Sequence, residues 1–233
     1  DQSGKSFDGE NTVAYTLTFT EGVQAIGTDD LTVTGATVDS VVHTAGSNTA
    51  TVNVTVTDDS IANVSITAKK SIVDMAGNPM VQAVVDNNQT VDTVNPSTVS
   101  GTPSVSDVTI TDADDGKTLD VSFTFSEAMD TGTTPTVTFD TAVASTLTGQ
   151  SGAWQSDGKT FKVQATIDDK GIDANEVTID ITGAKDVAGN LQVDHTATVD
   201  LEIDTKNPDE STISIVVADN DQTDADAATS FTV

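Results

Sequence analysis

Acidic side chains recur in this chain at a fixed separation, beside residues that favour tight turns. The segment Asp74–Asn78 (DMAGN) returns 112 residues later as Asp186–Asn190 (DVAGN), and Val91–Pro96 (VDTVNP) returns 112 residues later as Ile203–Pro208 (IDTKNP). Carboxylates, Asn side chains and backbone carbonyls are the oxygen ligands that hard divalent cations prefer. Two motifs with one common offset indicate that a whole structural unit is duplicated. The pattern therefore favours cation binding, repeated once per unit.

The elements that must position these residues are short β-strands. Apolar residues alternate with Thr, Ser and Asp, which is the pattern of half-buried strands. In the second unit the alternation predicts strands at residues 104–111, 119–126, 135–140, 145–149, 160–167, 176–182 and 197–203. In the first unit it predicts strands at residues 13–20, 31–38, near Val41, 50–56, 62–68 and 81–91. About seven strands per unit predict an all-β fold of tandem antiparallel immunoglobulin-like sandwiches.

The repeat divides the chain into two domains and a remainder. We expect a first Ig-like domain at residues 1–94, a second at residues 95–206, and the beginning of a third repeat at residues 207–233. Residue 1 aligns with about residue 107, so the first domain has little room for its first strand. Each full domain is large enough to bury a core of its own.

Counting strands up and down assigns the acidic residues to the two poles of each unit. The turn Asp186–Asn190 falls between the last two strands, at the N-terminal pole where the linker from the first unit arrives. Acidic clusters fall at the C-terminal pole: Asp112, Asp114 and Asp115, with Asp168 and Asp169, in the second unit, and Asp58 and Asp59, with Asp8 and Glu10 as weaker matches, in the first. Asp92 and Asp204 leave each unit from this same pole.

Crowded carboxylates point to calcium as the cation. Like charges raise the pKa of one another unless protons or cations are shared, and at neutral pH a divalent ion is the more plausible partner. Calcium accepts six to eight oxygen ligands in irregular geometry, whereas magnesium demands a tight octahedron and zinc prefers His or Cys.

Each motif also has a purely structural interpretation. Asp74 and Asp186 can cap a tight turn with their side chains while the following Gly adopts a positive φ. Asp92 and Asp204 can form a simple turn before Pro. The adjacent pairs Asp58-Asp59 and Asp168-Asp169 can belong to ordinary solvated loops. The sequence leaves these interpretations open beside cation binding.

Composition excludes several classes of partner. The chain has 9 Lys and no Arg against 37 Asp and Glu, a formal net charge of −28, which disfavours nucleic acid and anionic membranes. The acidic composition can also serve only to keep the protein soluble, or it can reflect a salty habitat. Cysteine is absent, so neither disulfides nor thiolate ligands are available. No apolar run approaches the ~18 residues that cross a bilayer, so we expect no direct membrane insertion.

Together the motifs resemble the bacterial immunoglobulin-like (Big) repeats of giant surface adhesins, including those of the repeats-in-toxin type. The matching features are Phe125-Ser-Glu127-Ala, paired with Phe19-Thr-Glu21-Gly, followed by the DxAGN turn and the DTxNP linker. The resemblance implies interdomain linkers that bind Ca²⁺ and stiffen. Carried over by position, the ligands would be Asp92 and Asp204 in the linkers, Asp58, Asp59, Asp112, Asp114, Asp168 and Asp169 in the C-terminal loops, and Asp186 and Asn190 across the first junction.

The resemblance also implies a function. We expect a non-enzymatic extender or stalk segment at the bacterial cell surface, whose partners are the neighbouring Ig-like repeats of one long chain and which reaches host or biofilm ligands through other domains. One alternative is an adhesive module that itself binds a glycan or a host protein, although aromatic residues are only 4% of the chain. Another is a filament subunit, in which residues 211–218 are donated as a strand to the next chain.

Catalysis finds little support in the sequence. His43 and His195 occupy unmatched positions in the two units and fit neither a zinc motif nor a Ser-His-Asp arrangement. Paired carboxylates could hydrolyse glycosides, but duplicated carboxylates beside a linker are more typical of metal binding. Trp154, the single tryptophan, has no counterpart in the first unit, and we expect it to fill a space in the core or at the edge of its own domain rather than to form a ligand platform.

Overall fold

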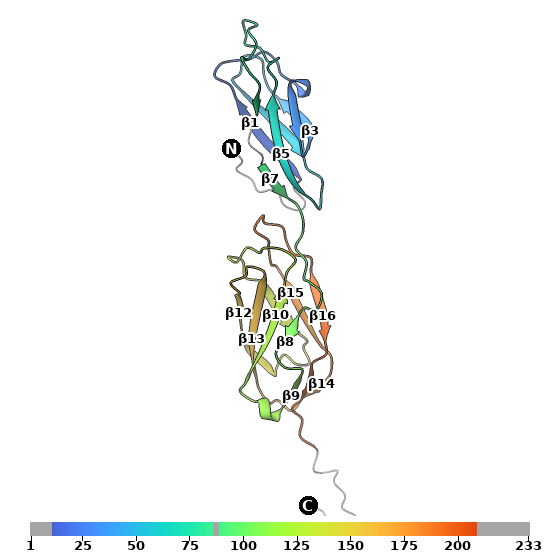
Figure 1. Ribbon diagram of the computed structural model, residues 1–233. Helices are drawn as coiled ribbons and strands as arrows, with labels where there is room; N and C mark the ends of the chain where they lie inside the picture. The colour runs from blue at the N-terminus through green and yellow to red at the C-terminus, as the bar shows by residue number, and fades with distance from the viewer. Residues whose placement is uncertain (1–10, 86–88, 209–233) are drawn as a thin grey trace, which may run out of the picture.

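Two sandwiches follow one another along a rod. The computed structural model describes residues 11–85 and 89–208, and the expected third repeat lies almost wholly outside them. The described residues form two separate apolar cores, one drawn from residues 13–91 and the other from residues 110–203. Figure 1 shows the two units end to end, with the chain crossing once between them. Separate cores confirm the predicted all-β fold of tandem sandwiches.

The second unit has the strand order of an immunoglobulin-like sandwich. Its described strands form one sheet in the order β12-β13-β10-β8 and an opposing sheet in the order β11-β15-β16. The strands are β8 (Ser104–Val105), β10 (Thr118–Thr124), β11 (Thr136–Phe139), β12 (Leu147–Trp154), β13 (Thr160–Ile167), β15 (Val177–Thr182) and β16 (His195–Val199). Alternate residues of β10 and β15 are buried between the sheets, as the predicted alternation requires.

A third, small sheet closes the C-terminal pole of the second unit. It joins β14 (Asp173–Ala174), β17 (Glu202–Asp204) and β9 (Thr109–Thr111), which precedes the short 3₁₀ helix η2 (Asp112–Asp114). The pairing of β17 with β9 is parallel, with Ile203 opposite Ile110. The second strand of the unit, β9, and its last strand, β17, therefore lie side by side at this pole.

The first unit repeats this plan with seven strands among the described residues, against ten in the second unit. Its sheets have the orders β1-β4-β3 and β2-β5-β6, with β7 paired to the far part of β5. The strands are β1 (Thr12–Thr18), β2 (Leu31–Thr34), β3 (Thr37–Val42), β4 (Thr49–Thr55), β5 (Ile61–Ala68), β6 (Val84–Val85) and β7 (Gln89–Asp92), with the 3₁₀ helix η1 (Thr28–Asp30) before β2. No strand among the described residues of the first unit corresponds to β8.

Four predicted strands are divided in the structure, and the one expected at residues 81–91 forms β6 and β7. Residues 31–38 form β2 and β3 in different sheets, because the chain turns at Gly35, which has φ 76° and where a Cβ atom would meet the Asn63 carbonyl oxygen. Residues 104–111 form β8 and β9, and residues 197–203 contribute to β16 and β17. The strand expected at 145–149 extends instead from Leu147 to Trp154. Alternation of polarity locates a strand but does not show where it changes sheets.

Trp154 is half-buried and packs against the core of the second unit, in the core or edge position that was expected. Its ring lies between Phe125, at a centroid distance of 5.7 Å, and Phe161, at 5.1 Å. The indole Nε1 donates to the Thr133 carbonyl oxygen at 2.8 Å, which satisfies the polar atom. The single Trp of the chain therefore reports on this unit, and Tyr15, the single Tyr, lies buried in the core of the first.

These two aromatic residues allow each unit to be followed separately. Phe123 is fully buried, so Phe123→Ala should lower the free energy of unfolding of the second unit by about 3–5 kcal/mol. We expect urea unfolding followed by Trp154 fluorescence to shift, while the NMR signals of Tyr15 keep their wild-type midpoint. Val52→Ala, in the first core, is the matched control and should give the opposite pattern. A shift of both probes by either variant would contradict independent cores.

Candidate metal centre at the junction of the units

The linker between the units is seated on the second unit as an additional strand. On one side, the Val99 N–H donates to the Thr124 carbonyl oxygen and the Ser126 N–H donates to the Ser97 carbonyl oxygen, each at 2.8 Å. On the other side, the Val193 N–H donates to the Pro96 carbonyl oxygen at 2.9 Å. These bonds fix the direction in which the linker leaves the second unit toward the first.

Asp92 and Thr93 anchor the start of this linker to the first unit. The Thr93 N–H donates to the Ser60 carbonyl oxygen at 3.0 Å, and the Thr93 hydroxyl accepts the Ser60 N–H at 3.1 Å. Asp92 Oδ1 accepts the N–H of Val94 at 3.0 Å, which closes a turn two residues long. Thr93 is fully buried. The carboxylate of Asp92 is thereby held at the C-terminal pole of the first unit.

The same anchor recurs at the end of the second unit. The Thr205 N–H donates to the Ile172 carbonyl oxygen at 2.8 Å, and the Thr205 hydroxyl accepts the Ile172 N–H at 3.1 Å. Asp204 Oδ1 accepts the Lys206 N–H at 3.2 Å. The turn predicted at Asp92 and Asp204 is present in both copies.

The turn Asp186–Asn190 faces the linker. Asp186 Oδ1 accepts the N–H groups of Gly189 at 2.6 Å and Asn190 at 2.8 Å, and its Oδ2 accepts the Asn190 side-chain amide at 2.7 Å. Gly189 has φ 108°, a conformation that residues with a side chain rarely adopt. The Asn190 amide also donates to the Asp92 carbonyl oxygen at 3.1 Å. The turn therefore caps itself and holds the linker at the same time.

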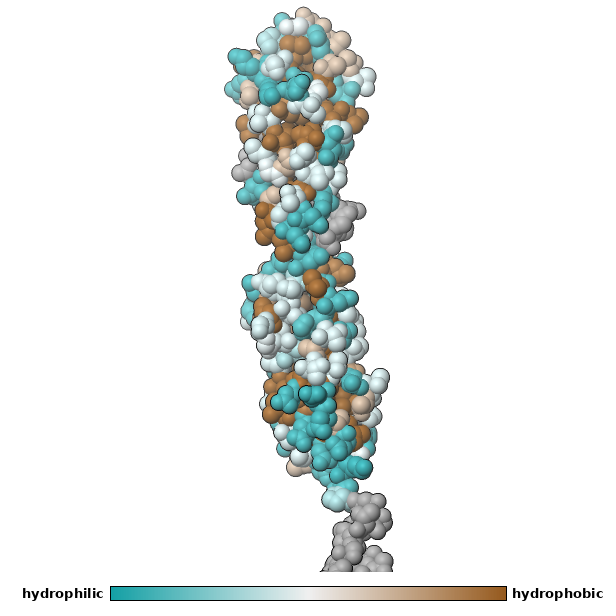
Figure 2. All heavy atoms as spheres, turned by 90° about the vertical axis from the view of Figure 1, so that its right-hand side faces the viewer, coloured by the Kyte–Doolittle hydropathy of each residue, from teal (hydrophilic) through white to brown (hydrophobic). Residues whose placement is uncertain are grey.

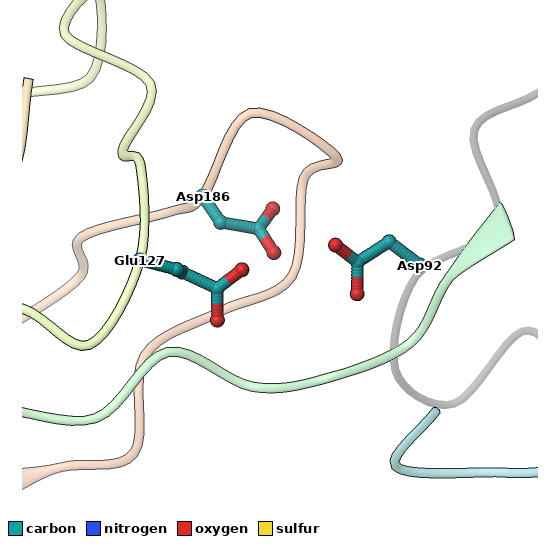
Figure 3. A group of neighbouring side chains, drawn as sticks. All are labelled: Asp92, Glu127 and Asp186. Carbon is teal, nitrogen blue, oxygen red and sulfur yellow. The ribbon is translucent and has the colours of Figure 1, made fainter. Parts of the chain in front are cut away.

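Three carboxylates meet where these segments converge. One oxygen each of Asp92, Glu127 and Asp186 lies within 4.8 Å of the other two. Figure 3 shows the three side chains pointing toward one another from three separate segments of backbone. Within residues 11–85 and 89–208, no other three His, Cys, Asp or Glu side chains meet this spacing. Asp186 is 1% exposed, and Asp92 and Glu127 are half-buried.

Glu127 reaches this cluster because its loop is tied to the turn. Met129 forms an antiparallel bridge with Asp186, and the Val187 N–H donates to the Ala128 carbonyl oxygen at 3.3 Å. Burial raises the pKa of Glu127 above its ordinary value of 4.5, and the charges of Asp186 and Asp92 raise it further, against a smaller opposing effect of Lys159. The cluster therefore carries negative charge that nearby positive side chains do not balance.

The donor set fits a hard divalent cation such as Ca²⁺. Calcium binds oxygen at ~2.3–2.6 Å, so two oxygen ligands of one ion stand at most about 5 Å apart. The three oxygens of this group satisfy that condition, because they lie within 4.8 Å of one another. Asp186 has lone pairs beyond its three accepted hydrogen bonds, since an ionised carboxylate offers about four acceptor positions. The set contains no imidazole or thiolate, which zinc would prefer.

The predicted ligands at the C-terminal pole of the second unit have other partners. Lys117 forms a salt bridge with Asp114 at 2.8 Å and, together with the Thr111 N–H, lowers the pKa of Asp114 to about 2. Asp168 Oδ2 accepts the Thr148 hydroxyl at 2.9 Å, and the Asp169 N–H donates to Asp115 Oδ1 at 2.9 Å. The two loops thus converge as strand counting predicts, without forming a group of three close carboxylates.

The remaining predicted ligands lie apart from the three-carboxylate group. Asp112 begins the 3₁₀ helix η2, and Asp204 leaves the second unit at the same pole. Asp58 and Asp59 lie in the loop that holds Thr93, and Asp59 adopts φ 51°. Their assignment as calcium ligands stays a prediction, as does that of Asn190, whose amide group is engaged by Asp186 and the linker. Asp8 and Glu10 lie outside the described residues.

Asp74, the first-unit counterpart of Asp186, forms the same turn in a more open setting. Its Oδ1 accepts the N–H groups of Ala76 and Asn78, each at 2.8 Å, and its Oδ2 accepts the Asn78 amide at 2.8 Å. The Asn78 side chain and N–H lower the pKa of Asp74. Gly77 has φ 91°. The turn therefore forms through its own hydrogen bonds. At Asp186, the junction between the two units adds the approach of Asp92 and Glu127.

Glu127 is the site residue that the ligand prediction omits. The sequence contains a signal for it, because Glu127 recurs as Glu21 at the same place after the strand that ends in Phe. That signal marks a repeated position without showing that its side chain turns toward the linker.

Comparisons with known proteins concern the fold. Two solved structures from Yersinia pseudotuberculosis resemble the chain: the adhesin InvE, at 13% identity and TM-score 0.30 over 89% of this chain and 61% of that one, and InvD, at 13% identity and TM-score 0.29 over 87% and 80%. The chain spans 61% of the InvE structure. No curated protein sequence matches it. No helix among the described residues is long and apolar enough to cross a membrane.

A family match agrees with the resemblance that the repeated motifs suggest. Residues 2–91 match the family of the bacterial Ig-like domain. This range covers the described strands β1 to β6 and most of β7, which form the two sheets of the first unit. The first unit of the chain is therefore similar to a bacterial Ig-like domain.

Proposed function

We propose that this chain is a non-enzymatic extender segment of a bacterial surface adhesin, and that calcium stiffens the junction between its repeats. The observation that carries the proposal is the meeting of Asp92, from the first unit, with Glu127 and Asp186, from the second, within 4.8 Å. A cation bound by all three would join the two units directly. The chain would act as a spacer that holds a binding domain away from the cell.

The physical role of the cation follows from charge. Three carboxylates repel one another when ionised, so without a cation the repulsion favours separation of the two units at their linker. A bound Ca²⁺ would reverse the sign of that interaction, since each carboxylate would be attracted to a shared divalent charge. The linker hydrogen bonds set the direction of the rod, and the ion would limit bending about it.

The setting of such a spacer is outside the cell, and its partners are repeats of its own kind. A net charge of −28 supports solubility and repels nucleic acid and anionic membranes. Contact with host or biofilm ligands is assigned to other domains of the same protein. The two turns at Asp92 and Asp204 give both units the same form of exit, which suits an array built from repeated joints.

A calcium titration tests the assignment of ligands. We expect isothermal calorimetry of the full chain to detect calcium binding that Asp92→Ala weakens at least tenfold, equivalent to about 1.4 kcal/mol. Asp204→Ala is the matched control, because it removes the same residue of the same motif at the opposite pole and should leave this site intact. Equal binding by wild type and Asp92→Ala would contradict the proposed site.

Stiffening has its own measurements. With free calcium at about a hundred times its dissociation constant, linkage predicts a stabilisation of about 3 kcal/mol, seen as a higher melting temperature. Small-angle scattering should show a narrower distribution of lengths with calcium than with a chelator. If calcium binds but the distribution of lengths does not change, calcium does not stiffen the junction between the units, and the proposed mechanical role of calcium is refuted.

The raised pKa of Glu127 predicts a pH dependence in calcium-free solution. The folded chain binds this proton more tightly than the unfolded chain, so ionisation of Glu127 costs folding free energy as the pH rises from 4.5 through the folded pKa. Glu127→Gln removes that cost. Its gain in melting temperature over wild type should be near zero at about pH 4 and should grow toward about pH 7. Glu21→Gln is the control, and an equal gain from both variants would argue against repulsion at the junction.

A further inference from the structure

A lysine lies beside the three-carboxylate group, on the turn that precedes β13. The Phe125 N–H donates to the Lys159 carbonyl oxygen at 3.0 Å, and the Met129 N–H donates to the Gly158 carbonyl oxygen at 2.8 Å. Glu127 lies midway in sequence between the two donors. The loop that carries Glu127 is therefore bonded at both ends to the turn that carries Lys159.

This turn is held in shape by Asp157. Its Oδ1 accepts the N–H groups of Lys159 at 3.0 Å and Thr160 at 2.9 Å, and its Oδ2 accepts the Thr160 hydroxyl at 2.7 Å. The backbone of Lys159 is thus bonded to Asp157 through its N–H and to Phe125 through its carbonyl oxygen. The lysine side chain therefore starts from a fixed position next to the loop of Glu127.

The charge of Lys159 acts on the three-carboxylate group. Of the lysines in the described part of the chain, Lys159 is the one whose charge lowers the pKa of Glu127, against the larger raising effects of burial and of the two neighbouring carboxylates. The salt bridges among the described residues are formed by Lys117 and Lys162. Lys159 is exposed, and no salt bridge of this described part takes up its charge.

The first unit has the same backbone arrangement without the lysine. The Phe19 N–H donates to the Asn48 carbonyl oxygen at 2.8 Å, as the Phe125 N–H, 106 residues later, donates to that of Lys159. The second bond between loop and turn recurs as well, from the Val23 N–H at 3.1 Å. Asn48 is therefore the structural counterpart of Lys159, and the arrangement itself does not require a lysine at this position.

A positive charge next to the carboxylates has two opposite effects. It reduces their mutual repulsion, and it repels an arriving divalent ion with twice the energy that a univalent ion would experience. Both effects act through water as well as through protein, because the surface where the two units meet is largely hydrophilic on the face shown in Figure 2. They should therefore be sensitive to salt.

We propose that Lys159 is a built-in counter-cation of the three-carboxylate group, which partly balances the group when no ion is bound and thereby weakens the binding of calcium. The inference rests on the proposed function, since it concerns how tightly the junction holds its ion. Lys159 is not a ligand in this role. It sets the calcium concentration at which the junction stiffens, and it limits the repulsion between the units below that concentration.

Calcium titration of matched variants tests the effect on affinity. Lys159→Asn gives the second unit the residue of the first, and should lower the calcium dissociation constant by about threefold or more at low ionic strength. Lys159→Arg keeps the charge and should keep the wild-type constant. The gain from Lys159→Asn should shrink at about 1 M salt, which a merely structural effect would not do.

Lys170→Asn is the control for net charge. It removes the same charge from an exposed position in the loop that contains Asp168 and Asp169, at the opposite pole of the second unit. We expect it to leave the dissociation constant of the junction unchanged. Equal constants for wild type and Lys159→Asn, or an equal gain from Lys170→Asn, would overturn the proposal.

A measurement in chelator separates this inference from the proposed function. At about pH 7, Lys159→Asn should lower the melting temperature of the wild-type chain, and should lower that of Glu127→Gln by at most half as much, because one of the charges that it balances is then absent. Equal losses in both backgrounds would give Lys159 a structural role and overturn the proposal. If no variant bound calcium, the calcium proposal would fail, and this comparison would still decide whether Lys159 balances the group.

Discussion

The seating of the linker on the second unit is the interaction on which the rest of the structure depends. One segment serves both as the connection between the units and as a strand of the second. Because Pro96, Ser97 and Val99 are held by backbone hydrogen bonds on both sides, the first unit has little freedom to choose another direction. The carboxylate cluster exists only because this seating brings Asp92 to Glu127 and Asp186. The linker therefore determines where the three carboxylates lie, and their negative charge determines that the site favours a cation.

Much of the fold could be predicted from the sequence alone. Alternation of apolar and polar residues located nearly every strand, and the strand predicted at 160–167 has the bounds of β13. The division of 104–111 between two sheets could not be predicted in this way, because both halves keep the same alternation. The turn after Asp107, whose carboxylate accepts the Thr109 N–H at 3.0 Å, redirects the chain without breaking the pattern.

The candidate site was predictable in part. The common offset of 112 residues relates Asp92 to Asp204 and Asp74 to Asp186, and strand counting then placed Asp92 and Asp186 at facing poles. Glu127 was missed as a member of the carboxylate cluster, since 37 acidic residues offer many candidates and only tertiary packing shows which of them turn inward. Asp114 was singled out from its neighbours in sequence, yet its carboxylate lies with Lys117. Whether an acidic side chain lies beside a lysine depends on loop geometry, which the sequence does not reveal.

The parallel pairing of β9 with β17 bears on how the second unit responds to force. Its linker arrives at one pole and its chain leaves at the other, so tension along the rod pulls these two neighbouring strands in opposite directions (Figure 1). Parallel strands loaded in this way slide past one another, and the bonds around Ile110 and Ile203 must rupture together rather than in succession. Resistance to such loading is a matter of the unfolding rate, not of equilibrium stability. The small sheet at the C-terminal pole is therefore placed so that it must break before tension can unfold the second unit.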